Sequence, residues 1–297
     1  MTPAQFDEST PLAAELADLS TRRASLDAAT APKPSRVRVF TVANQKGGVG
    51  KTTTAVNIAA ALARWGSTVL VVDLDPQSNA STALGVDHRG DHRSIYDVIV
   101  GVTPLADVIQ QSPENPHLLC APANLDLAGA EIELVSMAAR EYRLQRALEA
   151  YLASPAGATI DYVFIDCPPS LGLLTINAFV AAQEVLIPIQ CEYYALEGVS
   201  QLVGNIDRIT EHLNPDLQLS TILLTMFDTR TNLSHQVVAE VQSHFPNQTL
   251  QAVIPRSVRV SEAPSHGQTV IEYDNGSPGA LAYREAALEI ARRGAPR

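Results

Sequence analysis

One short stretch of this 297-residue chain, from Asn44 to Thr54, constrains its fold more than any other. It holds three glycines and two of the chain's three lysines, Lys46 and Lys51. Because glycine has no Cβ, backbone N–H groups can turn inward around an anion, and the positive end of a following helix adds to the attraction. The stretch therefore predicts a phosphate-binding loop between a strand and a helix.

The flanking residues have the order that a phosphate loop requires. Residues 37–43 have the pattern of a buried strand, and residues 52–65 repeat apolar side chains at helical spacing before Gly66. The general phosphate-loop pattern has glycine at position 45, where this chain has Gln45. Lys46 instead matches the deviant pattern K-G-G-x-G-K-[ST]. A glycine-rich turn without a ligand is the alternative interpretation.

The residue types of the loop suit phosphates accompanied by a magnesium ion. Lys51 would supply a movable positive charge for the β- and γ-phosphates, and the Thr52 hydroxyl would be a ligand for Mg²⁺. The expected nucleotide-binding residues of the loop are Lys46, Gly47, Gly48, Val49, Gly50, Lys51, Thr52 and Thr53.

From residue 36 onward, short apolar runs alternate with helical patterns. The expected strands are 37–43, 68–73, 117–121, 161–166, 184–190, 219–226 and 249–254. The expected helices are 52–65, 94–100, 125–136, 140–152, 171–182, 196–213, 234–244 and 279–293. Near-continuous apolar runs such as Val69–Val72 predict strands buried on both faces. The fold class is therefore α/β, with a doubly wound, mostly parallel sheet flanked by helices.

The chain is expected to divide into two parts. Residues 36–297 would form one P-loop ATPase domain. Residues 1–35 are rich in Ala, Ser, Thr, Pro and Asp and would form a flexible tail. A transient helix or a partner-binding helix near residues 12–26 is the alternative for part of that tail.

Three aspartates stand at the ends of two predicted strands. Asp73 and Asp75 end the strand at 68–73, and Asp166 ends the strand at 161–166. In doubly wound sheets, ligands bind beyond the carboxyl ends of the strands. Asp166 would hold the magnesium shell, Asp75 would orient or deprotonate the attacking water, and Asp73 would lie near the metal. Taken singly, each could equally be a helix cap or a loop residue.

Composition limits the function classes. The net charge of −11 at first argues against a nucleic-acid partner, but residues 225–297 hold 7 basic and 7 acidic residues and could carry a basic surface. No apolar run reaches transmembrane length and no signal-peptide pattern opens the chain, so a cytoplasmic protein is expected. Three widely spaced cysteines favour buried, reduced thiols.

Several motifs in order along the chain resemble the ParA/Soj family of chromosome- and plasmid-partition ATPases. They are Lys46–Thr54, Asp73–Gln77, Asp166–Gly172, Glu192–Gly198, Leu224–Thr231, Val253–Arg259 and Ser261–Gly267. The likeness runs from about residue 36 to residue 293, so it is far more specific than a phosphate loop alone.

The resemblance implies an ATP- and Mg²⁺-dependent homodimer in which Lys46 of each subunit reaches the phosphates bound by the other. The dimer would bind double-stranded DNA without sequence preference through Arg230 and Arg259, with Arg256 a weaker candidate. These arginines could equally be ordinary surface cations. A ParB-type partner would stimulate weak basal hydrolysis and so release the dimer from the nucleoid.

The resemblance also implies an adenine pocket at Pro255 and Arg256, where Ser257 replaces the asparagine of many relatives. Two other functions share this kind of loop. A biosynthetic amidoligase would need a substrate pocket, and a MinD-like ATPase would need an amphipathic C-terminal anchor. The alanine-rich end with interleaved acids resembles a docked helix instead, so no membrane partner is expected.

Overall fold

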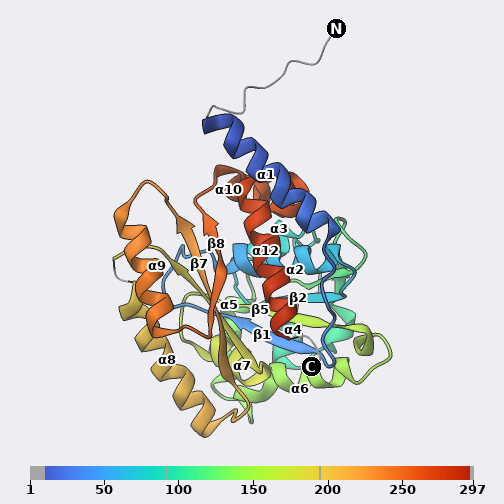
Figure 1. Ribbon diagram of the computed structural model, residues 1–297. Helices are drawn as coiled ribbons and strands as arrows, with labels where there is room; N and C mark the ends of the chain where they lie inside the picture. Colours follow the sequence, from blue (N-terminus) through green and yellow to red (C-terminus); the bar gives the residue numbers. More distant parts are fainter. Residues whose placement is uncertain (1–10, 91, 194, 295–297) are drawn as a thin grey trace.

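The computed structural model describes residues 11–90, 92–193 and 195–294, and it shows a central sheet between two layers of helices (Figure 1). The eight strands lie in the order β3-β4-β2-β5-β1-β6-β7-β8. All neighbouring pairs are parallel except β3 and β4, which are antiparallel. The α/β fold class and the mostly parallel sheet that the sequence predicts are confirmed.

The elements follow one another in alternation along the chain. The strands are β1 (Arg38–Val42), β2 (Val69–Asp73), β3 (Gln110–Gln111), β4 (Leu118–Ala121), β5 (Tyr162–Asp166), β6 (Glu184–Gln190), β7 (Gln218–Phe227) and β8 (Thr249–Pro255). The helices are α1 (Pro11–Ala28), α2 (Lys51–Arg64), α3 (Asn79–Ala83), α4 (Ile95–Val100), α5 (Leu127–Leu134), α6 (Arg143–Leu152), α7 (Leu173–Ala181), α8 (Ala195–His212), α9 (Asn232–His244), α10 (Val258–Glu262), α11 (Val270–Tyr273) and α12 (Pro278–Arg293).

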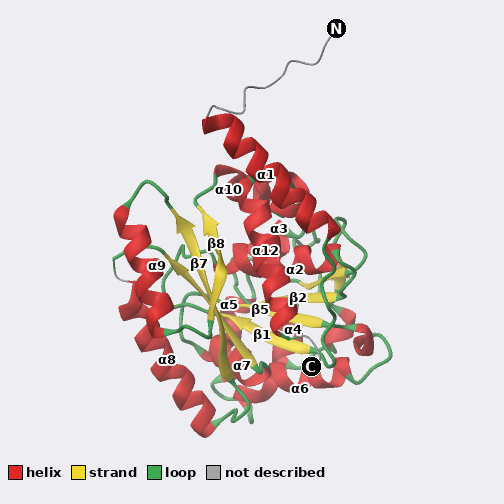
Figure 2. Ribbon diagram, viewed as in Figure 1, coloured by secondary structure: helices red, strands yellow, loops and turns green. Residues whose placement is uncertain are grey.

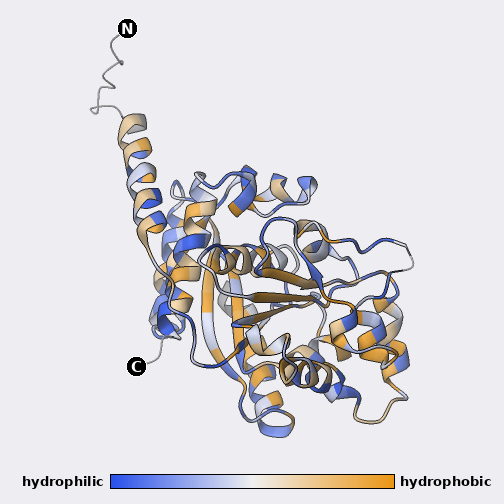
Figure 3. Cartoon of the chain, turned by 90° about the vertical axis from the view of Figure 1, so that its right-hand side faces the viewer, coloured by the Kyte–Doolittle hydropathy of each residue, from blue (hydrophilic) through white to orange (hydrophobic). Residues whose placement is uncertain are grey.

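Alternate residues of each strand enter different core layers. Phe40 and Val42 of β1 pack with α2 and α12 on one face of the sheet. Val39 of the same strand packs with α4 to α9 on the other face. The strands are apolar on both faces because both faces are covered, as Figures 2 and 3 show.

The structure contains short elements that the sequence patterns do not predict. They are β3, α3, α10 and α11, with two to five residues each. Such lengths carry too little periodicity to be recognised. For α3, tertiary contacts supply the explanation: the buried Asp73 carboxylate accepts hydrogen bonds from the backbone N–H and the hydroxyl of Ser81, at 2.8 and 2.6 Å.

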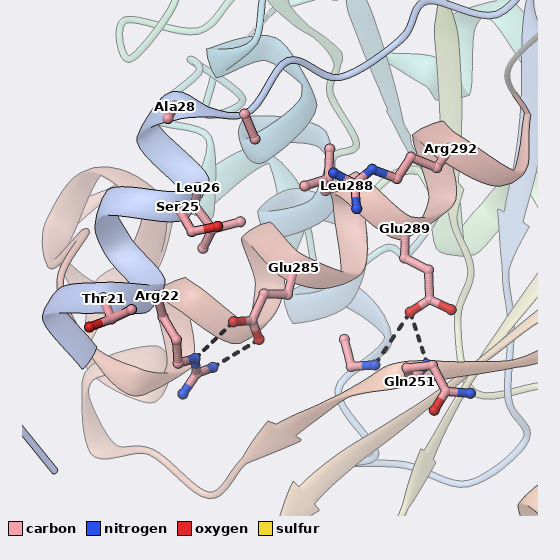
Figure 4. Close-up of a pocket in the computed structure, with 12 residues that line it drawn as sticks. Thr21, Arg22, Ser25, Leu26, Ala28, Gln251, Glu285, Leu288, Glu289 and Arg292 are labelled. Atoms are coloured by element: carbon pink, nitrogen blue, oxygen red, sulfur yellow. Dashed lines mark hydrogen bonds and ion pairs between the residues drawn. The ribbon is translucent and has the colours of Figure 1, made fainter. Parts of the chain in front are cut away.

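The N-terminal segment differs from the expected flexible tail over residues 11–28, which form the helix α1. Leu26 of α1 is buried against Leu281 and Leu288 of α12. Arg22 makes a two-pronged ion pair with Glu285, with both distances 2.8 Å (Figure 4). Residues 1–10 of the predicted tail lie outside the described residues.

Candidate nucleotide site

The glycine-rich loop lies between β1 and α2, at the carboxyl ends of the central strands. Gly48 and Gly50 have φ of 76° and 92°, which only glycine adopts without strain. The Asn44 side chain donates to the Pro188 carbonyl of β6 at 2.9 Å, and the Thr225 hydroxyl of β7 donates to the Val49 carbonyl at 2.9 Å. Strands β6 and β7, which lie on the same side of β1, therefore hold the loop in shape.

A cavity of about 480 Å³ opens above the start of α2. The loop contributes Gly47, Gly48, Gly50, Lys51, Thr52 and Thr53, while Asp75, Gln77 and Pro169 approach from the ends of β2 and β5. A volume of this order is typical of small-ligand sites. Residues from three separate strand–helix connections meet at one hollow, so the structure brings Lys51, Thr52 and Asp75 together.

The Lys51 side chain is buried in the loop. Its ammonium group donates to the Lys46 carbonyl at 3.2 Å. Burial lowers the pKa of Lys51, and the nearby Asp166 carboxylate acts in the opposite direction. The charged form of this buried ammonium group has few favourable partners, so an anion placed in the cavity would stabilise it.

Asp73 and Asp166 are opposite each other in the parallel pairing of β2 with β5, and both are fully buried. The oxygens of Asp73 accept hydrogen bonds from the Asp75 N–H and from Ser81. Both carboxylate oxygens of Asp166 lack a hydrogen-bond partner within the described residues. Asp73 is thus committed to holding the backbone, whereas Asp166 has oxygens available for a ligand.

The electrostatics of the two carboxyls agree with that division. Burial raises the pKa of Asp166 well above its usual value, and the adjacent Asp73 raises it further. Burial likewise raises the pKa of Asp73 to about 6, although its hydrogen bonds from Ser81 oppose the shift. An unpaired buried carboxylate is costly unless a cation compensates it.

A magnesium ion fits this donor set only together with phosphates. Within residues 11–90, 92–193 and 195–294, no group of three or more His, Cys, Asp or Glu side chains could hold a metal ion alone. Mg²⁺ commonly takes one or two carboxylates, hydroxyls and water along with substrate phosphates. Asp166 and Thr52 could supply the protein ligands of such a site.

Asp75 lies at the rim of the cavity, almost fully buried. One of its oxygens accepts the Gln77 N–H at 3.0 Å, which fixes the carboxylate in orientation. A carboxylate that faces a phosphate cavity and is held by its own turn can orient a water molecule. The predicted position of Asp75 next to the phosphate loop agrees with this geometry.

Lys46 is positioned differently from the rest of the loop. Its side chain is half exposed and forms an ion pair with Glu192, in the segment that follows β6. It does not line the 480 Å³ cavity. In this conformation the Lys46 charge is therefore satisfied within its own subunit.

A second hollow of about 110 Å³ adjoins the first and shares Gly50, Thr53 and Met226 with it. Pro255, Arg256 and Ser257 at the end of β8 line it, together with Tyr283 of α12. The sequence patterns did not single out Met226, which adopts a left-handed φ of 54°, or Tyr283. No local signal marks either residue, because only the packing of distant elements brings them to the site.

The three arginines predicted to bind DNA are not all free. The Arg230 side chain is 83% exposed, but it makes a two-pronged pair with Asp228 at 2.9 and 2.7 Å. Arg259 contacts Glu262 at 3.2 Å and Asp274 at 3.5 Å. Arg256 lines the smaller hollow. Hydrogen bonds from Arg230 lower the pKa of Asp228, and the charge of Arg256 adds to that shift. The sequence did not indicate these acidic partners.

Comparison with known proteins agrees with the geometry. The family described as "AAA domain" matches residues 37–219. The sporulation initiation inhibitor protein Soj of Bacillus subtilis is 50% identical over 258 residues, which are 86% of this chain and 99% of the relative. The chain belongs to the ParA/Soj family. The chromosome partitioning protein ParA of Myxococcus xanthus is 48% identical over 260 residues, 88% of this chain and 90% of the relative.

Solved structures of relatives show the same architecture. Cobyrinic acid a,c-diamide synthase from Mycobacterium smegmatis, with bound ADP and magnesium, has a TM-score of 0.74 and 41% identity, and the match covers 87% of this chain and 95% of that one. The septum site-determining protein MinD of Pyrococcus horikoshii, complexed with Mg-ADP, has a TM-score of 0.68 and 24% identity, covering 85% and 95%. The latter likeness concerns the fold alone.

As a member of this family of P-loop partition ATPases, the chain is a ParA-type ATPase. None of the helices within the described residues is long and apolar enough to cross a membrane.

Proposed function

We propose that this ParA/Soj-family ATPase hydrolyses ATP with Mg²⁺ and uses the cycle to bind and release DNA during segregation of a chromosome or plasmid. The observation that carries the proposal is the meeting of the glycine loop, the buried Lys51 and Asp75 around one cavity. Asp166 is buried near Lys51, and its carboxylate oxygens have no hydrogen-bond partner among the described residues. Relatives named as partition proteins, at about 50% identity over most of the chain, support the biological setting.

The residues of the cavity would divide the chemistry among them. The loop N–H groups and Lys51 would hold the β- and γ-phosphates, and Thr52 and Asp166 would hold the magnesium ion, with Asp73 fixing the neighbouring turn. Magnesium, when bound, neutralises charge on the phosphate oxygens. Asp75 would orient the attacking water. Pro255 and Arg256 would contact the base.

Lys46 would act in a dimer. For it to reach the phosphates of a second subunit, its ion pair with Glu192 must open. Both side chains are partly exposed, and such ion pairs contribute only about 0–1 kcal/mol to stability. Opening this pair therefore requires little free energy. Basal hydrolysis by a single subunit would be weak, because the second cation would be missing.

DNA binding would use Arg230 and Arg259, with Arg256 nearby. Their contacts would be to phosphates and hence independent of base sequence. Because Arg230 and Arg259 are paired with acids in this structure, DNA phosphates would have to replace Asp228, Glu262 and Asp274 as partners. A ParB-type protein would stimulate hydrolysis and release the dimer, giving a cytoplasmic protein that cycles on the nucleoid.

The experiment that tests this function is titration of ATP into the Lys51→Ala variant. Removal of the buried ammonium group should abolish measurable ATP binding in calorimetry, because the phosphates lose their cation. Lys33→Ala, which removes a surface lysine paired with Asp161, is the matched control and should bind as the wild type does. Retained affinity in Lys51→Ala would overturn the assignment of the loop.

A biosynthetic amidoligase remains the second candidate, because a 41%-identical solved structure is named as a diamide synthase. The two functions differ in what stimulates phosphate release. A partition ATPase should respond to DNA together with a ParB-type protein, and an amidoligase to cobyrinic acid with an amide donor. Stimulation by cobyrinic acid alone among these additions would favour the enzyme of biosynthesis.

A further inference from the structure

The helix α5 is apolar on two sides. Its inner side chains Leu127, Ala130 and Leu134 are buried in the core. Its outer side carries Leu125, just before the helix, then Ala128, Ile132 and Val135, at the spacing i, i+3, i+7 and i+10. An ordinary surface helix has polar residues on its outer side. We call these four residues the outer stripe.

The outer stripe is strongly exposed. Leu125, Ile132 and Val135 are 76%, 79% and 62% exposed. Leu171, in the loop after β5, is also exposed, and its neighbour Gly172 lies against Glu131 of α5. Single exposed apolar residues are ordinary, but a row of them on one helix marks an interaction surface.

The outer stripe lies beside the candidate nucleotide site. Leu125 and Asp126 line a hollow together with Pro76, Gln77 and Ser78. Gln77 also lines the phosphate cavity, next to Asp75. A partner on the stripe would therefore touch the turn that holds the Asp75 carboxylate.

The charge around the stripe selects the kind of partner. The helix α5 has no Lys or Arg, whereas Asp126 lies directly before it and Glu131 and Glu133 lie within it. Arg140 is paired with Glu141 and also donates to the Val135 carbonyl at 2.9 Å, and Arg89 lines the hollow beside Leu125. Opposing the α5 helices of two copies would bring these three acids of each copy together, so charge favours a basic partner over a second α5.

We propose that the outer stripe of α5 docks a basic amphipathic segment of another protein, with apolar residues at helical spacing and Lys or Arg between them. From Leu125 to Val135 the stripe would span about 15 Å if helical throughout, which matches about three turns of a partner helix. That this segment belongs to the hydrolysis-stimulating partner rests on the proposed function; the docking surface itself does not.

The test uses a fluorescently labelled 14-residue peptide of leucine and lysine, with the leucines on one helical face. The control peptide has the same sequence with every lysine replaced by glutamate. Anisotropy titrations without nucleotide would compare the full chain with the Ile132→Gln/Val135→Gln variant and with the control Leu16→Gln. Leu16 is an exposed apolar residue of α1, 53% accessible. Circular dichroism would check that all three chains are folded.

The expected result is binding of the lysine peptide at least about tenfold weaker, or about 1.4 kcal/mol, for the stripe variant than for the wild type. The Leu16→Gln variant should bind the lysine peptide as the wild type does. The glutamate peptide should bind none of the three chains. Equal affinity of wild type and stripe variant for the lysine peptide would overturn the proposal. So would a stripe variant that loses ATP-dependent self-association in light scattering but keeps peptide binding, because the stripe would then join two copies. A chain that selects the peptide through the stripe but fails to hydrolyse ATP would refute the proposed function and leave the docking surface standing.

Discussion

At the scale of single residues, Asp75 is the side chain whose chemistry can be isolated most cleanly. It faces the phosphate cavity and its orientation is fixed by the Gln77 N–H. Asp75→Ala should leave ATP binding intact and lower turnover by about 10²–10⁴-fold, because the attacking water loses its orienting carboxylate. Phosphate release and calorimetry measure the two effects. The control is Asp107→Ala, which removes an exposed acid paired with Arg93 and should leave turnover unchanged. Normal turnover in Asp75→Ala would show that Asp75 takes no part in the chemistry.

Arg230 is the residue that tests the DNA surface. Arg230→Ala should weaken binding to random-sequence duplexes and lower the slope of log affinity against log salt by about 1, because one phosphate contact is lost. Fluorescence anisotropy at several salt concentrations measures that slope. Arg36→Ala, an exposed arginine just before β1 at the amino ends of the strands, should leave it unchanged. An unaltered slope in Arg230→Ala would show that Arg230 serves only its ion pair with Asp228.

At the scale of elements, Glu114 connects the β3–β4 turn to the start of α11. It accepts the N–H and hydroxyl of Thr269, the latter at 2.8 Å. Burial raises its pKa to about 7 from an ordinary value of 4.5. The folded state therefore holds this proton more tightly than the unfolded state, so the contribution of Glu114 to stability falls as pH rises from about 4.5 to 7.

Glu114→Gln should flatten that part of the stability profile, since a neutral amide cannot titrate. Urea denaturation of wild type and variant at pH 5, 6 and 7 measures the difference. The wild type should lose stability relative to the variant as pH rises. Parallel profiles would mean that Glu114 ionises in the folded chain as it does in the unfolded one.

At the scale of the whole molecule, α1 connects the N-terminal segment to the layer behind the nucleotide site. Arg284 of α12 is only 1% exposed, and Asp27 of α1 accepts from it at 2.6 Å. The preceding residue, Tyr283, lines the hollow beside the phosphate loop. Asp27→Asn should cost about 1–3 kcal/mol, because a buried guanidinium loses its charged partner. Urea denaturation measures this cost. The control Asp18→Asn, at an exposed position of α1, should lower the free energy of unfolding by less than about 0.5 kcal/mol. An equally small loss for Asp27→Asn would show that the pairing of α1 with Arg284 does not stabilise the fold.

The sequence by itself determined the phosphate loop, the alternation of strands and helices, and the carboxylates at the strand ends. These features depend on neighbouring residues: glycine is needed where φ is positive, and buried strands need continuous apolar runs. Only the tertiary structure decided that Asp73 accepts hydrogen bonds from Ser81, whereas the Asp166 oxygens find no hydrogen-bond partner among the described residues. It also decided that Lys46 and Arg230 are paired with acids. The docking of α1 on α12 and the exposure of the outer stripe were decided in the same way. Each depends on partners brought together from distant parts of the chain, and apolar periodicity alone does not say which face of a helix the core will cover.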